Sequence, residues 1–321
     1  MQTKQANTPL FRRFRMPLIC AALFPAVAAV TPAYGQEPTS PVIKINESAA
    51  HAQITTTALK GNISMLEGSG GNIGVLTGKD GKFMVDGGIA LSKVRIAEAL
   101  AAISDAPLKY LVNTHYHWDH ADSNVWLHAR GATIVASPDT RKHLSATTRV
   151  DDWDFTFKPT PTPGLPTVLV RKPKTYHFDG QTITVIPVPP AHTDGDLYVT
   201  FKPANVVFLG DLFWNGVYPF IDNENGGSID GMIRANDAIL AAVDADTVIA
   251  PGHGPVGNRA QLVEFRDMLV AIRDKVAALK KQGKSLSEVI AAKPTASYDA
   301  KYGNFVINPD FFTKIVYEGL K

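Results

Sequence analysis

Side chains that bind metals recur in four short segments of this 321-residue chain, each directly after a stretch with the pattern of a strand. Five of the nine histidines lie in residues 113–120, 190–196, 208–211 and 250–254, together with Asp119 and Asp211. In layered α/β folds, ligands bind along one edge of the sheet, where strands end. The chain is therefore expected to fold so that these four segments meet at such an edge.

Residues 113–120 have the sequence Asn-Thr-His-Tyr-His-Trp-Asp-His. His115 and His117 are two residues apart, so on a chain leaving a strand both rings can point the same way. Asp119 and His120 follow on the turn and can face a second ion nearby. Imidazole and carboxylate suit Zn²⁺, Fe or Mn rather than Ca²⁺. This spacing favours a metal site over the alternative, a solvated histidine-rich loop.

His192, Asp211 and His253 carry little information singly, because a lone histidine or aspartate is more often an ordinary surface or core residue. Each follows an apolar strand, however, and glycine beside Asp211 and His253 lets the backbone approach a crowded site. Together with the first segment they make seven ligand-type residues. One tetrahedral ion cannot use so many, so two metal ions are expected.

Hydrophobic periodicity predicts an α/β fold of two similar halves. Short strands are expected within 54–86, then a helix at 91–103, a strand at 110–113, a helix at 121–129, a strand at 132–136 and a long loop at 151–166. Strands return at 181–188, 197–201 and 206–209, followed by a helix at 230–243, a strand at 247–250 and helices at 260–280, 285–291 and 310–320. Two such halves predict a four-layer αββα sandwich with extra C-terminal helices.

The first 35 residues have the pattern of a signal peptide. Four basic residues precede an apolar run at 16–30, and Ala33-Tyr34-Gly35 offers a cleavage site. A membrane anchor is the alternative, but the run is short for a spanning helix and contains two prolines. The expected organisation is therefore a signal peptide at 1–35, a flexible lead-in at 36–50, a catalytic domain at 51–258 and a packed helical extension at 259–321. Such a protein would be periplasmic or secreted, without stable membrane insertion after processing.

Charge and cysteine content exclude several functions. Removing residues 1–35 takes away four basic residues and no acid, so the net charge changes from +2 to −2. A mature surface of this kind gives no case for nucleic acid or anionic lipid as a partner, and a small-molecule substrate is expected. Cys20 is the only cysteine and lies within the expected signal peptide, which excludes thiolate chemistry in the mature protein.

The four segments together resemble the signature of the metallo-β-lactamase superfamily: HxHxDH, a later histidine, a strand-terminal Gly-Asp, and Pro-Gly-His-Gly. The resemblance runs from about Ile54 to Gly257. It implies an αββα sandwich with His115, His117 and His192 on one metal ion. Asp119, His120 and His253 would bind the other ion, and Asp211 would bridge the two.

The ligand set looks more like that of glyoxalase II and lactonases than that of the β-lactamases in the same superfamily. Some β-lactamases place a cysteine where this chain has Asp211, and others lack a bridging aspartate. Flavo-diiron oxygen reductases carry a glutamate where this chain has His117. A β-lactamase activity therefore stays an alternative rather than the leading interpretation.

The implied activity is that of a binuclear hydrolase, with two zinc ions and with iron or manganese as alternatives. Two such ions hold a shared hydroxide, formed because the pKa of bound water falls to about 7, and it attacks an ester, thioester, lactone or amide carbonyl. Asp119 would be the catalytic residue, a ligand that orients and shuttles a proton. An iron-dependent persulfide oxidoreductase and a non-catalytic metal-binding protein are the other classes considered.

Substrate contacts are harder to predict. Asn215 and Tyr218 follow Asp211 closely and are candidates, although they fit ordinary loop residues equally well. Trp153 lies in the proline- and aromatic-rich segment 151–166, which we hypothesise to form an apolar lip over the site. The alternative is that its aromatic side chains pack inside the sandwich. Tyr116 and Trp118 are expected to serve packing.

Overall fold

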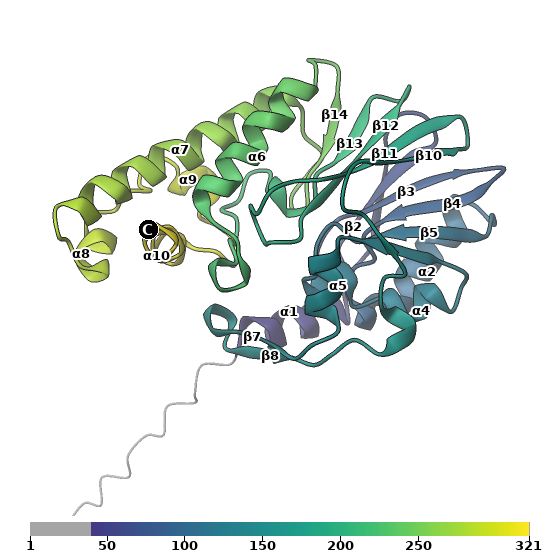
Figure 1. Cartoon of the computed structure of the whole chain (residues 1–321), viewed down its shortest axis with the longest axis horizontal. Coiled ribbons are helices and arrows are strands. Elements are labelled where there is room, and N and C mark those ends of the chain that lie inside the picture. The colour runs from purple at the N-terminus through teal and green to yellow at the C-terminus, as the bar shows by residue number, and fades with distance from the viewer. Residues whose placement is uncertain (1–39, 321) are drawn as a thin grey trace, which may run out of the picture. The chain divides into compact units, whose positions relative to one another are not determined.

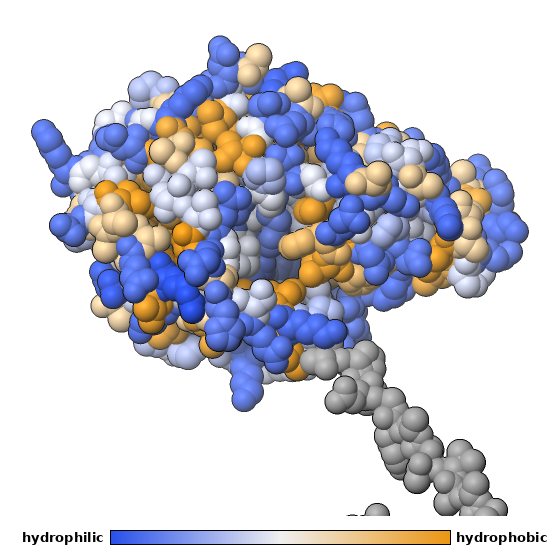
Figure 2. Space-filling view, turned by 180° about the vertical axis from the view of Figure 1, so that it is seen from behind, coloured by the Kyte–Doolittle hydropathy of each residue, from blue (hydrophilic) through white to orange (hydrophobic). Residues whose placement is uncertain are grey.

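The structure is a computed structural model that describes residues 40–320 (Figure 1). The signal peptide expected at residues 1–35 lies outside the described residues. Within them, no helix is both long and apolar enough to cross a membrane. Figure 2 shows the face opposite to that of Figure 1, where hydrophilic side chains predominate and hydrophobic ones form separate patches around a hollow.

The first sheet has seven strands, in the order β1-β2-β3-β4-β5-β6-β9. Neighbours are antiparallel from β1 to β4 and parallel from β4 to β9. The strands are β1 (Thr55–Ala58), β2 (Ile63–Glu67), β3 (Ile73–Gly78), β4 (Gly81–Val85), β5 (Leu108–Val112), β6 (Thr133–Ala136) and β9 (Val168–Leu169).

The second sheet has five strands, in the order β10-β11-β12-β13-β14. Its first four strands form antiparallel pairs, and β13 pairs with β14 in parallel. The strands are β10 (Lys174–Phe178), β11 (Gln181–Pro187), β12 (Leu197–Lys202), β13 (Val206–Phe208) and β14 (Val248–Ala250).

Alternating side chains divide between separate hydrophobic layers. On β4, Phe83 and Val85 pack with Phe201 of the second sheet, whereas Met84 packs on the other side with Ile96 of α2 (Lys93–Ile103). The outer face of the second sheet packs through residues such as Ile249 on α6 (Ile229–Ala242) and α7 (Arg259–Lys281). Figure 1 shows α6 and α7 beside the second sheet and α2 and α4 (Asn124–His128) beside the first. The expected αββα sandwich is confirmed.

The remaining helices include three at the C-terminal end. These are α8 (Leu286–Ala291), α9 (Asp299–Tyr302) and α10 (Pro309–Gly319), and α10 packs against α7 and α8. The shorter helices α3 (Trp118–Ala121) and α5 (Pro138–Leu144) follow β5 and β6. The helix predicted at 121–129 corresponds to α4, whereas the turn predicted at Asp119 and His120 is helix α3, and α5 is not predicted.

Two expectations about loops are wrong. Within the expected flexible lead-in, helix α1 (Pro41–Ala49) forms because Ser40 caps it and Val42 is fully buried. Within the expected loop at 151–166, β8 (Phe155–Phe157) pairs with β7 (Thr148–Val150) in a hairpin. Arg149 closes the turn by ion pairs to Asp151 and Asp154.

Candidate metal centre

Seven buried histidine and aspartate side chains lie at one end of the two sheets, in two groups. The ligand atoms within each group lie within 4.8 Å of one another. The first group follows β5, β11 and β13, and the second follows β5 and β14. The members of the first are His115, His117, His192 and Asp211, and those of the second are Asp119, His120 and His253.

Asp211 contacts both groups. One carboxylate oxygen, Oδ2, lies 3.7 Å from His115 Nε2, 3.4 Å from His192 Nε2 and 3.4 Å from His253 Nε2. The other, Oδ1, lies 3.0 Å from His120 Nε2. Asp211 is therefore the side chain through which two neighbouring ions would share a ligand.

Four of the imidazoles are oriented through the ring nitrogen that points away from the cluster. His115 Nδ1 lies 3.0 Å from Thr114 Oγ1, and His192 Nδ1 lies 2.8 Å from the carbonyl oxygen of Phe220. Carboxylates hold the other two: Asp222 Oδ2 lies 3.0 Å from His117 Nε2, and Asp86 Oδ2 lies 2.9 Å from His120 Nδ1. Such partners fix the tautomer and the ring plane, and so leave the inner nitrogens free for metal ions.

Burial and neighbouring charges set the protonation of the cluster. Burial lowers the pKa of His192 to about 4, and burial together with the charge of His120 lowers that of His115 well below its ordinary value. Burial also acts to lower the pKa of His253, but Asp211 and Asp119 outweigh it and raise that pKa to about 9. Burial alone would raise the pKa of Asp211, yet the surrounding histidines hold it well below its ordinary value.

The donor set fits metal ions. Within the described residues, His115 Nε2 is buried and has no hydrogen-bond partner, although it faces the cluster. Two residues beside the ligands are glycine, and any side chain at either position would collide with a ligand. A Cβ at Gly252 would lie 2.0 Å from Asp211 Oδ1, and one at Gly71 would lie 2.2 Å from His120 Cε1. Glycine at these positions therefore lets the chain approach the ligands closely.

A small apolar pocket leads to the cluster. His117, Asp119, Asp211 and His253 reach its floor. Its walls come from several elements, including α1 and the turn between α9 and α10, and their side chains are Ile45, Trp118, Trp153, Trp214, Phe220, Phe305 and Val306. Gly70, from the turn between β2 and β3, completes the rim.

The three candidate substrate contacts have different positions. Tyr218 is wrong as a contact, because its ring is fully buried and its hydroxyl donates to Asp299 Oδ1 at 2.9 Å. Asn215 lies outside this pocket, and its amide donates to the carbonyl oxygen of Pro255. Trp153 reaches the pocket wall, but only 4% of it is exposed, and it packs in the core with ring centroids 4.9 Å from Phe220.

Sequence reasoning missed the residues that support the ligands. Asp222 and the Phe220 carbonyl carry no local signal, because they lie far along the chain from the histidines that they orient. Asp86 directly follows strand β4, as the ligands follow their strands, and that placement could have identified it. Trp118 was expected to serve packing, yet it lines the pocket.

The sequence model of the metallo-beta-lactamase superfamily matches residues 66–253, which include every residue of both groups. The chain belongs to the metallo-beta-lactamase superfamily, whose members are generally metal-dependent hydrolases.

Solved structures with the same fold include lactamases and a sulfatase. A metallo-beta-lactamase from Pontibacter korlensis matches over 68% of this chain and 99% of its own, with a TM-score of 0.56 and 18% identity. One from Cronobacter sakazakii with a HARLDQ motif matches over 74% and 99%, with a TM-score of 0.60 and 19% identity. A sec-alkylsulfatase from Pseudomonas sp. matches over 86% of this chain, with a TM-score of 0.62 and 15% identity. The chain spans 52% of that sulfatase.

Proposed function

We propose that this protein is an exported binuclear hydrolase that cleaves an ester, thioester, lactone or amide. The observation that carries the proposal is the meeting of two buried ligand groups, both touched by Asp211, at the floor of an apolar pocket. Export is inferred from the pattern of residues 1–35 alone.

The residues divide between two ions, which we take to be zinc. His115, His117 and His192 would hold one ion, Asp119, His120 and His253 the other, and Asp211 both. Such ions polarise a carbonyl oxygen and make water nucleophilic near neutral pH. Asp211 would set the distance between them, and the outer hydrogen bonds orient the imidazoles that would bind them.

Asp119 is placed to handle a proton. Its Oδ2 lies 3.3 Å from His253 Nε2 and 3.6 Å from His120 Nε2, and its side chain reaches the pocket. A carboxylate at this position orients a water molecule, accepts its proton and passes it to the departing group. The apolar wall formed by Trp214 and Phe220 excludes other water from the reacting atoms.

The test is metal analysis of the mature protein, combined with a panel of substrates. The panel contains a thioester, a lactone, an aryl ester, a β-lactam and a secondary alkyl sulfate, and oxygen uptake is followed with a persulfide. Hydrolysis of carbonyl substrates with two bound metal ions supports the proposal. Turnover of only the β-lactam or the sulfate would change the substrate class, and oxygen uptake with a single iron would replace the hydrolase by an oxidoreductase.

Asp211→Ala tests the shared ligand. Because Asp211 touches both groups, the change should lower the metal content from two ions per chain and remove most turnover. Metal is measured by plasma emission spectroscopy after gel filtration. Asp246→Ala, a change to an exposed aspartate outside both groups, is the matched control. A stoichiometry near one in the parent protein that Asp211→Ala leaves unchanged would contradict the binuclear assignment.

A further inference from the structure

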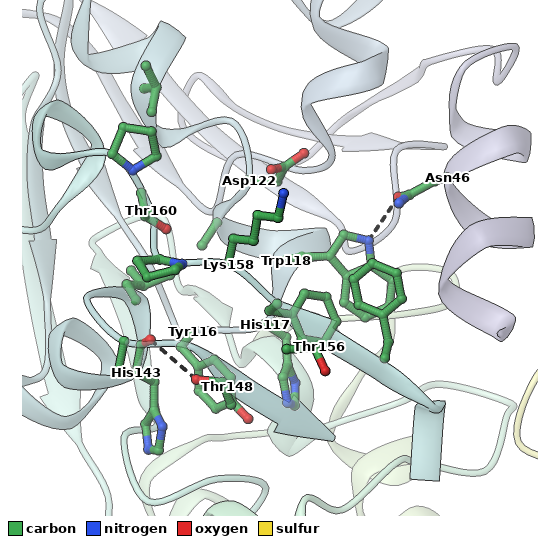
Figure 3. A pocket seen from close by; sticks show the side chains of 18 residues that line it. Asn46, Tyr116, His117, Trp118, Asp122, His143, Thr148, Thr156, Lys158 and Thr160 are labelled. Atoms are coloured by element: carbon green, nitrogen blue, oxygen red, sulfur yellow. Dashed lines mark hydrogen bonds between the residues drawn. The ribbon is translucent and has the colours of Figure 1, made fainter. Parts of the chain in front are cut away.

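A second cavity, of about 610 Å³, lies next to the metal pocket (Figure 3). Its walls come from α3, the β7–β8 hairpin and the segment that follows β8, and Asn46 of α1 reaches it from another side. Cavities that bind small molecules have volumes of about 300–1,000 Å³. The volume of this cavity lies within that range.

This cavity and the metal pocket share two lining residues, His117 and Trp118. The indole of Trp118 is held in place, because its Nε1 donates to Asn46 Oδ1 at 3.0 Å, as drawn in Figure 3. Its ring also stacks on Phe157, with centroids 5.3 Å apart. The two cavities are therefore adjacent, with His117 and Trp118 on the boundary between them.

The lining of the cavity favours an apolar occupant. Phe155, Phe157, Leu144 and Val125 contribute hydrocarbon surface. The buried polar side chains of the lining already have partners. The Tyr116 hydroxyl donates to Asp222, His117 Nε2 lies 3.0 Å from the same carboxylate, and the Thr148 hydroxyl donates to the carbonyl oxygen of His143. A polar ligand would lose hydrogen bonds to water and gain few in return, whereas an apolar ligand gains by leaving water.

Charge is confined to the mouth of the cavity. His143 Nε2 lies 2.9 Å from Asp194 Oδ1, so that imidazole is already paired. Lys158 lines the cavity (Figure 3) and is exposed. Within the described residues, no hydrogen bond or ion pair retains the Lys158 ammonium group inside the cavity. The interior therefore receives the hydrocarbon part of a ligand, and any polar part of it lies at the mouth or at the metal groups.

From these contacts we infer that the cavity binds an apolar aliphatic or aryl substituent of the substrate, on one side of the bond that is cleaved. The inference rests on the proposed hydrolase function and names the substrate class: esters, thioesters or amides with a medium-length hydrocarbon group. Each methylene group transferred from water to such a cavity raises affinity by up to about fourfold.

Two series of thioesters test the inference with the zinc-loaded protein. In one, the acyl group of N-acetylcysteamine thioesters grows from acetyl to octanoyl, and in the other the alkyl group of S-alkyl thioacetates grows from ethyl to octyl. The expected result is that kcat/KM rises by about two- to fourfold per methylene group in one series until the cavity is full. A flat profile in both series would overturn the inference.

A substitution that fills the cavity provides a second test. Thr156→Trp places an indole in the cavity from an exposed position of β8, where a strand accepts aromatic residues. We expect the loss in kcat/KM to be at least about tenfold greater for the octyl or octanoyl substrate than for the shortest one. Thr175→Trp, a change at an exposed threonine of β10 outside the cavity, is the matched control and should keep the chain-length profile. Ala146→Trp fills the cavity from another side should Thr156→Trp fail to fold.

Calorimetric titration separates this inference from the proposed function. Straight-chain carboxylates from acetate to octanoate are titrated into the parent protein, Thr156→Trp and Thr175→Trp. Affinity that grows with chain length in the parent and the control, but not in Thr156→Trp, supports the cavity even if no thioester is hydrolysed. Equal growth in all three proteins would refute it, whereas absence of turnover alone would count against the proposed hydrolase.

Discussion

Asp222 supports the metal centre without belonging to either ligand group. Its Oδ2 accepts hydrogen bonds from His117 Nε2 and the Tyr116 hydroxyl, and its backbone N–H donates to the carbonyl oxygen of His192. The carboxylate therefore orients the His117 imidazole directly, and the Asp222 backbone holds the backbone of His192 in place. Because Asp222 is only 1% exposed, water cannot easily supply the hydrogen bonds that would be lost if the carboxylate were removed.

At the scale of one residue, we predict that Asp222→Asn weakens metal binding. The amide keeps the size of the side chain and, through its oxygen, accepts from Asn225, but the NH2 group that then faces His117 cannot accept a hydrogen bond. Loss of such a partner lowers metal affinity by about 10- to 100-fold. Zinc affinity is measured by competition with a chromophoric chelator. Asp246→Asn, at an exposed aspartate, should bind zinc like the parent, and an equal affinity in Asp222→Asn would show that the contact is only structural.

At the scale of an element, Trp153 connects the β7–β8 hairpin to the core. Its ring contacts Phe220, lies 6.1 Å from Trp118 and 6.1 Å from Phe311 between ring centroids, and its carbonyl oxygen accepts from Ser40 at the start of α1. Burial of this extent favours the packing alternative for Trp153 over the hypothesis of a lip.

We therefore predict that Trp153→Ala lowers the free energy of unfolding by about 3–5 kcal/mol. For a chain of this size, the melting temperature should fall by about 10 °C. Differential scanning calorimetry measures the shift, with Phe305→Ala as a control because Phe305 is 46% exposed at the pocket mouth. A Trp153→Ala protein with unchanged melting temperature and a raised KM would restore the lip hypothesis.

The order of strands and helices could be predicted because buried strands and amphipathic helices repeat apolar residues at fixed spacings. The β7–β8 hairpin could not, since its three-residue strands are too short to show a period and prolines follow them. Helix α1 was missed for another reason. Although Ser40 and Pro41 are a local signal for a helix start, the burial of Val42 and the bond from Trp118 to Asn46, which also stabilise the helix, are tertiary contacts that no local pattern reveals.

Within the metal centre too, residues in local patterns could be predicted and residues placed by tertiary contacts could not. The side chains that the structure brings together could be named from the sequence because HxHxDH is a local pattern and the other three end predicted strands. Tyr218 was named because it follows Asp211 closely along the chain. The chain turns between them, however, and the Tyr218 ring stacks on Phe312 of α10 with centroids 4.7 Å apart.

At the scale of the whole molecule, bound metal ions would connect the two halves of the sandwich. The ligands after β5 belong to the first sheet, and those after β11, β13 and β14 belong to the second. An ion present at a hundred times its dissociation constant stabilises the folded state by about 2.7 kcal/mol. We predict that chelation lowers the melting temperature by about 5–10 °C. Adding back zinc should restore it, and a melting temperature insensitive to the chelator would contradict this coupling.

Removal of the predicted signal peptide is also a property of the whole protein. We predict cleavage after Gly35, because basic residues, an apolar run and small residues occur in the order of a signal peptide. The intact mass of the protein in the periplasmic fraction measures the cleavage site. A periplasmic or membrane-bound species that keeps residues 1–35 would contradict the proposed processing.

The walls of the metal pocket come partly from outside the superfamily region. Ile45 precedes residues 66–253, whereas Phe305 and Val306 follow them. Part of the pocket wall is therefore encoded outside the stretch that carries the metal ligands and can vary separately from them. Grafting α1 and the turn between α9 and α10 onto another member of the fold would transfer part of the pocket wall without altering a single ligand.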